Sequence, residues 1–522
     1  MHPADLIVIC VYMAALVLVG LRVSRRQRTT DAYFVAQRAI PGWATGMSLL
    51  ATIITSVTFI AYPGAAYAGN WSLLVPGLMF VVVLALIGAV IVPFFRHTVA
   101  MSVYEYFGKR FGKGVRVYAS LAFAIGHFAK MGFVFYLLAL TVGEITGWRV
   151  SVIIVVLGTI TVFYTWIGGL KAVIWTDVLQ GFVLWTGIAV SIGVLLFSPR
   201  VNTWQILHMI ARNHKTGLGS FQLNLHQPTF WTLALYGLFF YLQKYTSDQT
   251  VVQRYLAAKT DRAALRGIGI GALMCVPVWT AFMFIGSLLW AFYRTTGEML
   301  PAAIAKPDQI FPYFMVTQMP AGVAGLFLAA LFGAGMSMLA SDLNCLALVI
   351  VEDHYGLFFP GRTDRQRLRF GKASVAVSGV LAMGVALRLA SSHGGILALY
   401  YTATAIVAGG LAGLFLLAFL SRKAGPAAAL TGIAAALLFT GWATLTRNGG
   451  KTLDLHAWNY PWNEYTIGAV GNVLLLLTGW VVSQLFPATI GKEQTLTLWG
   501  WLAAQKPGTQ PPHKPMQIAA GN

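Results

Sequence analysis

Long apolar runs are the feature that most constrains how this chain can fold. Segments such as Leu73–Pro93, Val152–Trp166 and Thr466–Phe486 contain no charged side chain over lengths that reach or approach a membrane span. A helix needs about 20 residues to cross the hydrocarbon of a bilayer. Only helices and closed barrels satisfy their backbone in that environment, and these runs lack the alternating pattern of barrel strands. The sequence therefore predicts an all-α polytopic membrane protein.

The charged residues are few, and their positions carry information. They make up 10% of the 522 residues, against about 25% in a soluble domain. The net charge is +20, and many of the Arg and Lys gather in four groups, within residues 22–38, 96–116, 254–266 and 362–372. Cytoplasmic loops of membrane proteins are enriched in these residues. The basic groups therefore indicate cytoplasmic loops and not a nucleic-acid partner, and they place the amino terminus outside and the carboxyl terminus inside.

Hydropathy predicts about thirteen transmembrane helices. They lie near residues 5–22, 45–67, 73–95, 116–146, 150–167, 172–198, 229–248, 266–294, 321–352, 371–390, 394–421, 425–445 and 465–486. This gives a leading helix and loop, a first group of five helices, an outer loop, a second group of five, two trailing helices and a partly disordered cytoplasmic tail. The corresponding ranges are 1–44, 45–198, 199–228, 229–421, 422–486 and 487–522.

The two groups of five helices begin on opposite sides of the membrane, so we expect an inverted repeat. The first helix of each group contains residues that suit a continuous helix poorly. One expected break is Tyr62-Pro63-Gly64 with the Thr-rich stretch before it, and the other lies near Lys244–Asp248. Interrupted helices at matching places in inverted halves point to the central binding site of a transporter.

Two motifs carry further information. The stretch Gly168–Gln180 (GGLKAVIWTDVLQ) places an acid, Asp177, inside an apolar helix, where a carboxylate is costly unless it meets a cation or a proton. The second stretch is Thr246–Lys259 (TSDQTVVQRYLAAK). Both resemble signatures of the sodium:solute symporter family, and the resemblance extends over residues 5–486. The stretch Lys130–Leu140 (KMGFVFYLLAL) resembles the corresponding helix of bacterial sialic acid symporters within that family.

The resemblance implies a LeuT-like inverted repeat and a sodium site where the first helix of repeat one meets the third helix of repeat two. By resemblance, the sodium ligands are the backbone oxygens of Ala51, Ile54 and Ala334 and the hydroxyl of Ser337. The family usually supplies another hydroxyl at the next position, which here is Met338. A thioether is a poor ligand for a hard cation.

Asp342 follows Met338 by four residues, on the same helical face. With Ser337, Ser341 and Asp177, it is expected to form a carboxylate-rich cation site. Two carboxylates held close together could equally trap a proton, because like charges raise one pKa sharply.

The solute site is expected to face the two breaks. Candidate solute contacts are Thr55, Thr58, Lys130, Tyr241 and Lys244. A buried lysine needs an anion, and neither lysine has an evident acid in its own turn. In the sialic acid symporters, a basic residue matching Lys130 engages the carboxylate of the substrate. The range 73–95 contains no amide side chain, which favours an organic acid over a neutral sugar.

These observations predict a secondary active transporter of a plasma (bacterial inner) membrane. It moves a small organic solute inward with sodium; the solute is an organic acid or a carboxylated sugar. The expected partners are the solute, sodium ions and the bilayer, with no cofactor. The alternatives are a proton-coupled or neutral-sugar symporter of the same fold, and a solute sensor. The chain has no phosphate-binding glycine loop, zinc motif or nucleophile elbow, so no enzyme is expected.

Overall fold

The computed structural model describes residues 2–505 except 25–26, 302–303, 305, 321, 392–408, 451–452 and 489–495. These residues form helices and no β-strand. The helices are α1 (Pro3–Ser24), α2 (Thr30–Val35), η1 (Ala36–Arg38), α3 (Gly42–Ile53), α4 (Ser56–Ala68), α5 (Leu74–Thr98), α6 (Tyr104–Phe111), α7 (Lys113–Thr146), α8 (Val150–Leu196), α9 (Thr203–Arg212), α10 (Phe230–Ser247), α11 (Gln249–Ala257), α12 (Asp261–Thr296), η2 (Pro307–Gln309), α13 (Ile310–Gln318), α14 (Val323–Val349), η3 (Ile350–Tyr355), α15 (Gly356–Phe358), α16 (Asp364–Ser391), α18 (Leu411–Leu420), α19 (Pro426–Gly450), η4 (His456–Trp458), α20 (Tyr465–Leu485) and α21 (Leu498–Ala504).

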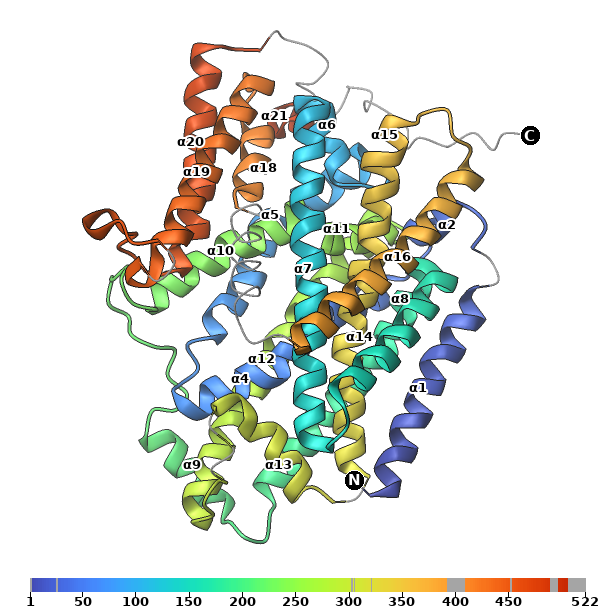
Figure 1. The fold of residues 1–522 in the computed structure, drawn as a ribbon. Coiled ribbons are helices and arrows are strands. Elements are labelled where there is room, and N and C mark those ends of the chain that lie inside the picture. The colour runs from blue at the N-terminus through green and yellow to red at the C-terminus, as the bar shows by residue number, and fades with distance from the viewer. Residues whose placement is uncertain are drawn as a thin grey trace.

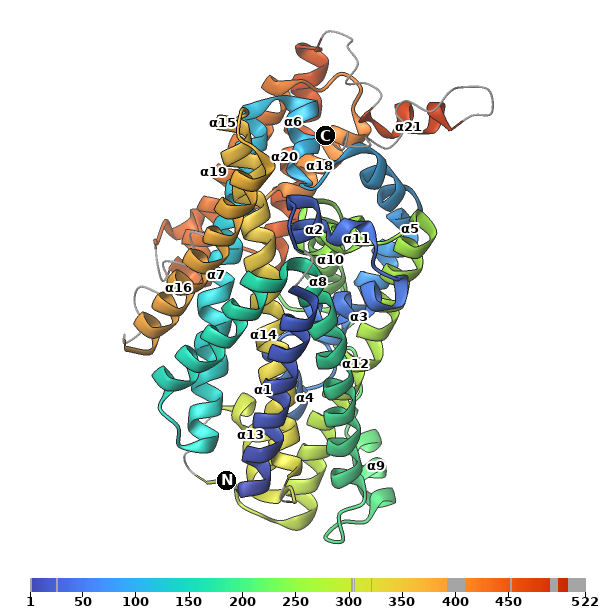
Figure 2. The ribbon, with the colours of Figure 1, turned by 90° about the vertical axis from the view of Figure 1, so that its right-hand side faces the viewer.

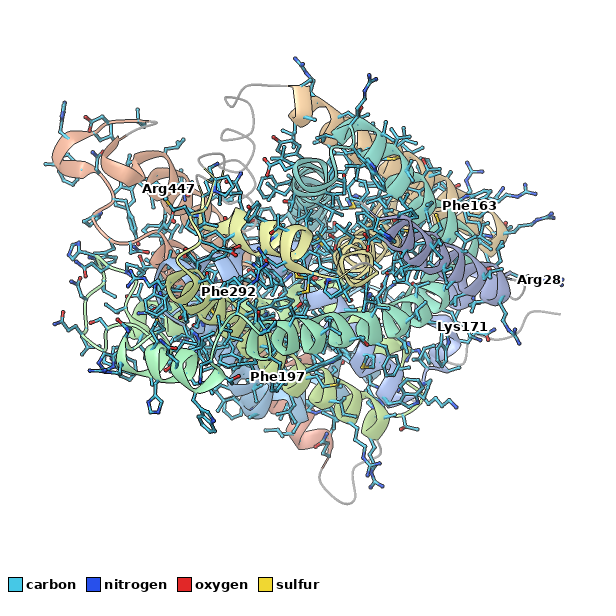
Figure 3. All side chains as sticks on the ribbon, turned by 90° about the horizontal axis from the view of Figure 1, so that it is seen from below. Arg28, Phe163, Lys171, Phe197, Phe292 and Arg447 are labelled. Carbon is cyan, nitrogen blue, oxygen red and sulfur yellow. The ribbon has the colours of Figure 1, made fainter. Side chains whose placement is uncertain are left out.

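The helices pack as a bundle with α14 at its centre (Figure 1). In the most apolar 18 residues of its span, 89% are buried inside the protein, whereas the figure for α1 is 22%. The outer helices instead expose large apolar side chains. Phe163, on α8, is 41% exposed and lies at the outer edge of the molecule (Figure 3). An apolar periphery around a buried central helix is the arrangement expected of a protein that faces lipid.

The first helix of the first repeat is broken in the Thr-rich part of the expected stretch and not at Tyr62-Pro63-Gly64. Helices α3 and α4 meet at an angle of 61°. Between them, Ile54 (φ −81°, ψ 111°) and Thr55 (φ −108°, ψ 170°) are extended. Pro63 lies inside α4, so the predicted break at Tyr62-Pro63-Gly64 is wrong. Membrane helices tolerate an internal proline because neighbouring groups can satisfy the carbonyl that it frees. The Thr-rich stretch before it forms the break.

The second break lies within the predicted stretch. Helix α10 ends at Ser247 and α11 begins at Gln249, with the extended residue Asp248 (φ −99°, ψ 112°) between them. The carboxylate of Asp248 accepts hydrogen bonds from the backbone N–H of Thr250 at 2.9 Å and from its hydroxyl at 2.5 Å. Asp248 is therefore the N-cap that starts α11.

Helix α8 contains two arms joined at a single residue. Gly169 has φ 56° and ψ −158°, a backbone conformation that is essentially restricted to glycine. Figures 1 and 2 show α8 running up to this turn and back down again. The hydroxyl of Tyr33 donates to the carbonyls of Thr165 and Trp166, both at 3.0 Å, and so satisfies two carbonyls where the first arm ends. The second arm carries Asp177.

The predicted count of thirteen spans stays a prediction. Among the described residues, nine helices are long and apolar enough to cross a membrane, or ten if α3 and α4 form one span. This count treats α8 as a single helix and does not include α10. Most of the expected span 394–421 lies outside the described residues, which include only its end in α18. The proposed division into two five-helix groups is likewise untested.

Candidate functional site

Asp177 lies at the centre of a fully buried polar cluster. Ser48 of α3 donates to its Oδ2 at 2.5 Å, and Ser337 of α14 donates to its Oδ1. The guanidinium of Arg254, from α11, approaches Oδ2 at 3.5 Å. Ser341 accepts a hydrogen bond from the same guanidinium. We call these five residues the Asp177 cluster, and none of them has measurable solvent exposure. Its single carboxylate is balanced by a single guanidinium.

Arg254 is held by hydrogen bonds from each of its side-chain nitrogens. Nε donates to the hydroxyl of Ser48 at 3.3 Å, and one terminal nitrogen donates to the backbone oxygen of Thr250 at 3.0 Å. The other terminal nitrogen contacts Ser341 and Asp177. The sequence prediction had placed Arg254 in a cytoplasmic loop. That prediction is wrong because residues 249–257 form a short buried helix, α11, which directly follows the break at Asp248.

The predicted sodium ligands of the first site also meet at the broken helix. The hydroxyl of Ser337 lies 3.2 Å from the carbonyl oxygen of Ala51, in the last turn of α3. Carbonyls in the last turn of a helix lack helical partners and remain available to a ligand. Ile54 is in the break itself, and Ala334 precedes Ser337 by one turn of α14. The structure therefore joins the two helices that the resemblance assigns to this site.

Asp342 does not join Asp177, contrary to the sequence prediction. Ser337 and Ser341 are four residues apart, so they share the face of α14 that meets Asp177. Asp342 is one residue further along, and one step turns the side chain by roughly 100°. It therefore points to α7, where it contacts His127 and Lys130. The predicted site with two carboxylates does not form.

Asp342 belongs to a second group of charges, which we call the Asp342 cluster. Its members are Asp342, His127, Lys130, Asp248 and Lys244. His127 bridges the two acids, with Nδ1 2.9 Å from Asp342 and Nε2 3.2 Å from Asp248. Lys130 Nζ lies 2.9 Å from Asp342 Oδ2, and Lys244 Nζ lies 2.5 Å from Asp248 Oδ2. Both lysines therefore have acidic partners, which the sequence prediction had missed.

The remaining predicted solute residues have structural contacts in this conformation. The hydroxyl of Thr58 accepts from the backbone N–H of Thr55 at 3.4 Å, which helps to start α4 after the break. Tyr241 is buried among aromatic rings, with ring centroids 4.7 Å from Phe80 and 6.2 Å from Trp279. Thr55 lies at the break, and its side chain is half-buried.

Comparison with known proteins decides the family. A profile described as "Sodium:solute symporter family" matches residues 33–435. The sodium/sialic acid symporter NanT of Aliivibrio fischeri is 30% identical over 489 residues, covering 92% of this chain and 93% of NanT. SiaT of Proteus mirabilis, also a sodium/sialic acid symporter, is 30% identical over 478 residues, covering 91% and 94%. The chain belongs to the sodium:solute symporter family.

Solved structures agree with this assignment. A Na+-coupled sialic acid symporter, in its substrate-bound outward-open state, matches with a TM-score of 0.85 and 29% identity, over 94% of this chain and 100% of the other. The nucleobase-cation symporter Mhp1 matches with a TM-score of 0.54 at 17% identity, which bears on the fold alone. The chain is thus a sodium-coupled symporter, an integral protein of the plasma membrane with a LeuT-like fold, and its relatives are transporters and not enzymes.

Three site residues of the symporter escaped the sequence prediction, each for a different reason. His127 is not among the predicted site residues, because both of its acidic partners lie outside its own helix, Asp342 on α14 and Asp248 at the second break. The pairing of Lys244 with Asp248 has the i, i+4 spacing and was visible in the sequence. The pairing of Arg254 with Asp177 joins residues 77 positions apart. Only the packing of α11 against α3 and α14 brings Arg254 to Asp177.

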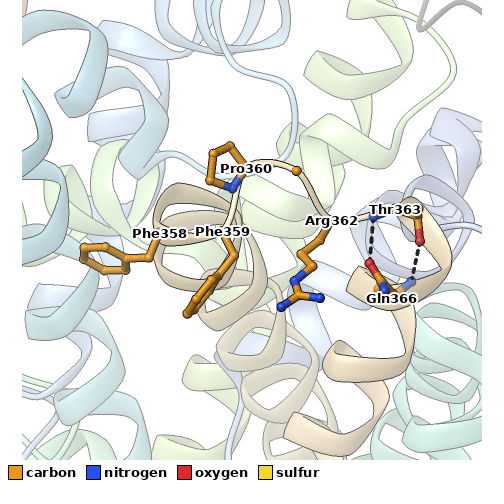
Figure 4. Close-up of a pocket in the computed structure, with 7 residues that line it drawn as sticks. Phe358, Phe359, Pro360, Arg362, Thr363 and Gln366 are labelled. Carbon is orange, nitrogen blue, oxygen red and sulfur yellow. Dashed lines mark hydrogen bonds between the residues drawn. The ribbon is translucent and has the colours of Figure 1, made fainter.

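The symporter also has a surface depression, which is separate from these clusters. It lies at the turn between α15 and α16 and is lined by Phe358, Phe359, Pro360, Gly361, Arg362, Thr363 and Gln366 (Figure 4). Its lining includes no acid that could hold a cation and no residue of either cluster. We therefore locate the candidate site at the Asp177 and Asp342 clusters.

Proposed function

We propose that the symporter carries a carboxylated sugar of the sialic acid type into the cell together with sodium. The observation that carries this proposal is the position of Lys130. Its side chain is 32% exposed, whereas that of its partner Asp342 is fully buried. The ammonium has three N–H groups, and Asp342 engages it through its two oxygens. A solute carboxylate can therefore approach Lys130 without displacing Asp342.

The charge of the Asp342 cluster supports an acidic solute. Two carboxylates face two ammonium groups, so the cluster has no excess of negative charge when His127 is neutral. A neutral imidazole has one N–H and satisfies one of the two carboxylates, while an imidazolium satisfies both. Protonation of His127 therefore adds one positive charge. In neither form does the cluster repel an anion.

For the coupling ion, we propose the oxygens of Ala51, Ile54, Ala334 and Ser337 as sodium ligands. Hard cations prefer several oxygen ligands that replace their water. Backbone carbonyls beside a broken helix supply such oxygens without a dedicated carboxylate. The contact between Ser337 and Ala51 supports this assignment.

Uptake into proteoliposomes tests the function. Radiolabelled N-acetylneuraminate should accumulate under an inward sodium gradient, and a proton gradient alone should not drive it. The matched control solute is the methyl ester of N-acetylneuraminate, in which a neutral ester replaces the carboxylate and which should compete poorly. Neutral hexoses should not compete. Uptake of hexoses but not of N-acetylneuraminate would refute the acid proposal, and uptake driven by protons without sodium would favour proton coupling.

We further propose that the amino terminus lies outside the cell. Helix α1 starts at the end of the molecule that carries α9 and α13, and the basic segments before α7 and α16 lie at the opposite end (Figures 1 and 2). The positive-inside rule makes this opposite end cytoplasmic. A cysteine introduced at His2 should react with an impermeant maleimide on intact cells, and one introduced at Gln505 should not. The reverse pattern would overturn the orientation.

A further inference from the structure

The surface depression between α15 and α16 contains an arginine that is available to an external ligand. Its volume of about 590 Å³ lies in the range of pockets that hold small molecules. The guanidinium of Arg362 lines it and lies 5.9 Å from the centre of the Phe359 ring (Figure 4). With the described residues, this guanidinium makes no hydrogen bond or ion pair. We propose that the depression and the outer face of α16 bind an anionic phospholipid.

Two further arginines extend the positive charge along α16. Arg365 and Arg369 are four residues apart, so they share one face of the helix, and both are exposed. Neither forms an ion pair in the part of the chain that the structure describes. The one acid between residues 358 and 372 is Asp364, which accepts hydrogen bonds from the backbone N–H of Thr30 at 3.3 Å and from its hydroxyl at 2.5 Å. Three guanidiniums therefore remain for an external anion.

The same face of α16 continues as an apolar surface. At intervals of four residues after Arg369 come Ala373, Val377 and Leu381, all of them exposed. Helix α16 lies at the outer edge of the bundle (Figure 2), and its other face packs on α7, α8 and α14. From Arg369 to Leu381 a helix rises about 18 Å, close to the ~15 Å of hydrocarbon in one leaflet. A phospholipid whose headgroup meets the arginines can therefore lay its acyl chains along this face.

Aromatic side chains at the same end favour a lipid over a soluble anion. Phe358 is 63% exposed and Phe359 is 51% exposed. Phe370, next to Arg369, is 39% exposed and stacks on Tyr355 with the ring centroids 4.2 Å apart. Exposed apolar rings beside basic residues are typical of surfaces that lie in the headgroup region of a bilayer. A free phosphate would use the arginines and leave these rings in water.

The guanidinium group selects a phosphate with net negative charge. It is planar, always charged and can donate two parallel hydrogen bonds to one phosphate. Each basic side chain near an anionic membrane surface strengthens binding about fivefold. A zwitterionic lipid contains its own cation and gains less. Membrane topology alone calls for basic residues in this segment, but not for their alignment with an apolar stripe.

Native mass spectrometry of the purified full-length symporter, titrated with lipid in detergent, tests the proposal. The wild-type protein should bind dioleoylphosphatidylglycerol about tenfold or more tightly than dioleoylphosphatidylcholine, which has the same acyl chains. In Arg362→Gln/Arg365→Gln/Arg369→Gln, the two Kd values should come within about twofold of each other. Equal affinity for the two lipids in the wild-type protein would overturn the proposal, and so would an unchanged preference in the triple variant.

A matched control separates this surface from basic residues in general. Lys259, Arg262 and Arg266 belong to another basic segment and are also exposed. Lys259→Gln/Arg262→Gln/Arg266→Gln removes the same charge and should keep the preference for phosphatidylglycerol. If both triple variants lose it to the same extent, the lipid responds to net charge and the proposed site does not exist.

A competition experiment separates a lipid from a soluble anion. Glycerol 1-phosphate carries a phosphate headgroup without acyl chains, so a large excess should not displace phosphatidylglycerol. Displacement at a concentration equal to that of the lipid would assign the arginines to a soluble anion and overturn the proposal. Arg362→Gln alone, which removes one exposed charge, should weaken phosphatidylglycerol binding about fivefold. An unchanged Kd in this variant would exclude the depression from the site.

Discussion

The two charged clusters of this symporter lie on neighbouring faces of α14 and differ in the solvent exposure of their side chains. Every residue of the Asp177 cluster is fully buried, and its contacts are with other members of the bundle. In the Asp342 cluster the acids are buried, but the side chain of Lys130 is 32% exposed and that of Lys244 is 17% exposed. A sealed site suits a fixed charge or a small ion, whereas an open one can exchange a solute. The two clusters therefore differ in role because the Asp342 cluster exposes a cation, Lys130, and not because they contain different numbers of charges.

Lys130→Ala should have the largest effect, because it removes the exposed cation of the open cluster. We expect the initial rate of N-acetylneuraminate uptake to fall about 100-fold, because the solute carboxylate loses its cation and a hydrogen bond to a charged group contributes about 1.5–3 kcal/mol. Lys130→Arg should retain part of the rate. Proteoliposome uptake, normalised to the amount of reconstituted protein, measures both. Membrane insertion should be unaffected, because removal of a charge from an apolar helix favours insertion.

The double variant Lys130→Ala/Asp342→Asn shows which role Lys130 has. If Lys130 only balances Asp342, neutralising the acid removes the need for it, and the double variant should recover transport. If Lys130 binds the solute carboxylate, the double variant should stay inactive. Recovery to near the rate of Asp342→Asn alone would show that Lys130 serves only as the ion-pair partner of Asp342, just as Arg254 pairs with Asp177.

Gly169→Ala should destabilise the arm of α8 that carries Asp177 into the sealed cluster. The backbone there has φ 56°, and an added Cβ would lie 2.5 Å from the carbonyl oxygen of Tyr33. Residues forced into such a conformation cost about 1–3 kcal/mol. The melting temperature of the purified protein should fall. Gly384→Ala is the control: its Cβ meets no neighbour within 4 Å, and alanine favours a helix interior by about 1 kcal/mol. Equal melting temperatures for the two variants would contradict the role of the turn.

The sequence predicted the membrane-spanning helices, the family and the existence of two broken helices, because hydropathy and motifs are local properties. Its expected first break included the Thr-rich stretch, which is right, and Tyr62-Pro63-Gly64, which is wrong, because a helix in a membrane can continue through a proline. The partners of the buried charges were mostly invisible. Asp342 and Lys130 are 212 positions apart, and the direction of Asp342 depends on one residue step along α14. Packing between helices decides which charges meet.

Ser337→Ala should affect sodium more than solute, because Ser337 touches both the proposed sodium ligand Ala51 and Asp177. We expect the sodium concentration for half-maximal uptake to rise about tenfold, equivalent to about 1.4 kcal/mol. By linkage, the apparent affinity for the solute should fall at fixed sodium. Saturating sodium should restore most of the rate. Ser191→Ala provides the control, since that buried hydroxyl donates to the carbonyl of Gly187 within its own helix. An unchanged sodium dependence in Ser337→Ala would remove Ser337 from the sodium site.

Met338→Ser should have the smallest effect. It should strengthen sodium binding, whereas Ser337→Ala should weaken it. The family usually has a hydroxyl at this position, and the buried thioether here is a poor sodium ligand. A serine next to Ser337 adds one hard oxygen to the proposed site, so the sodium concentration for half-maximal uptake should fall about two- to fivefold. The buried Met336 offers the control: Met336→Ser adds the same hydroxyl two residues earlier on the helix and should leave the sodium dependence unchanged. Both variants lose comparable apolar packing, so a difference between them reports the ion and not stability. If the two variants respond alike, the sodium site does not lie beside Ser337, and the assignment of the ion to this face of α14 is wrong.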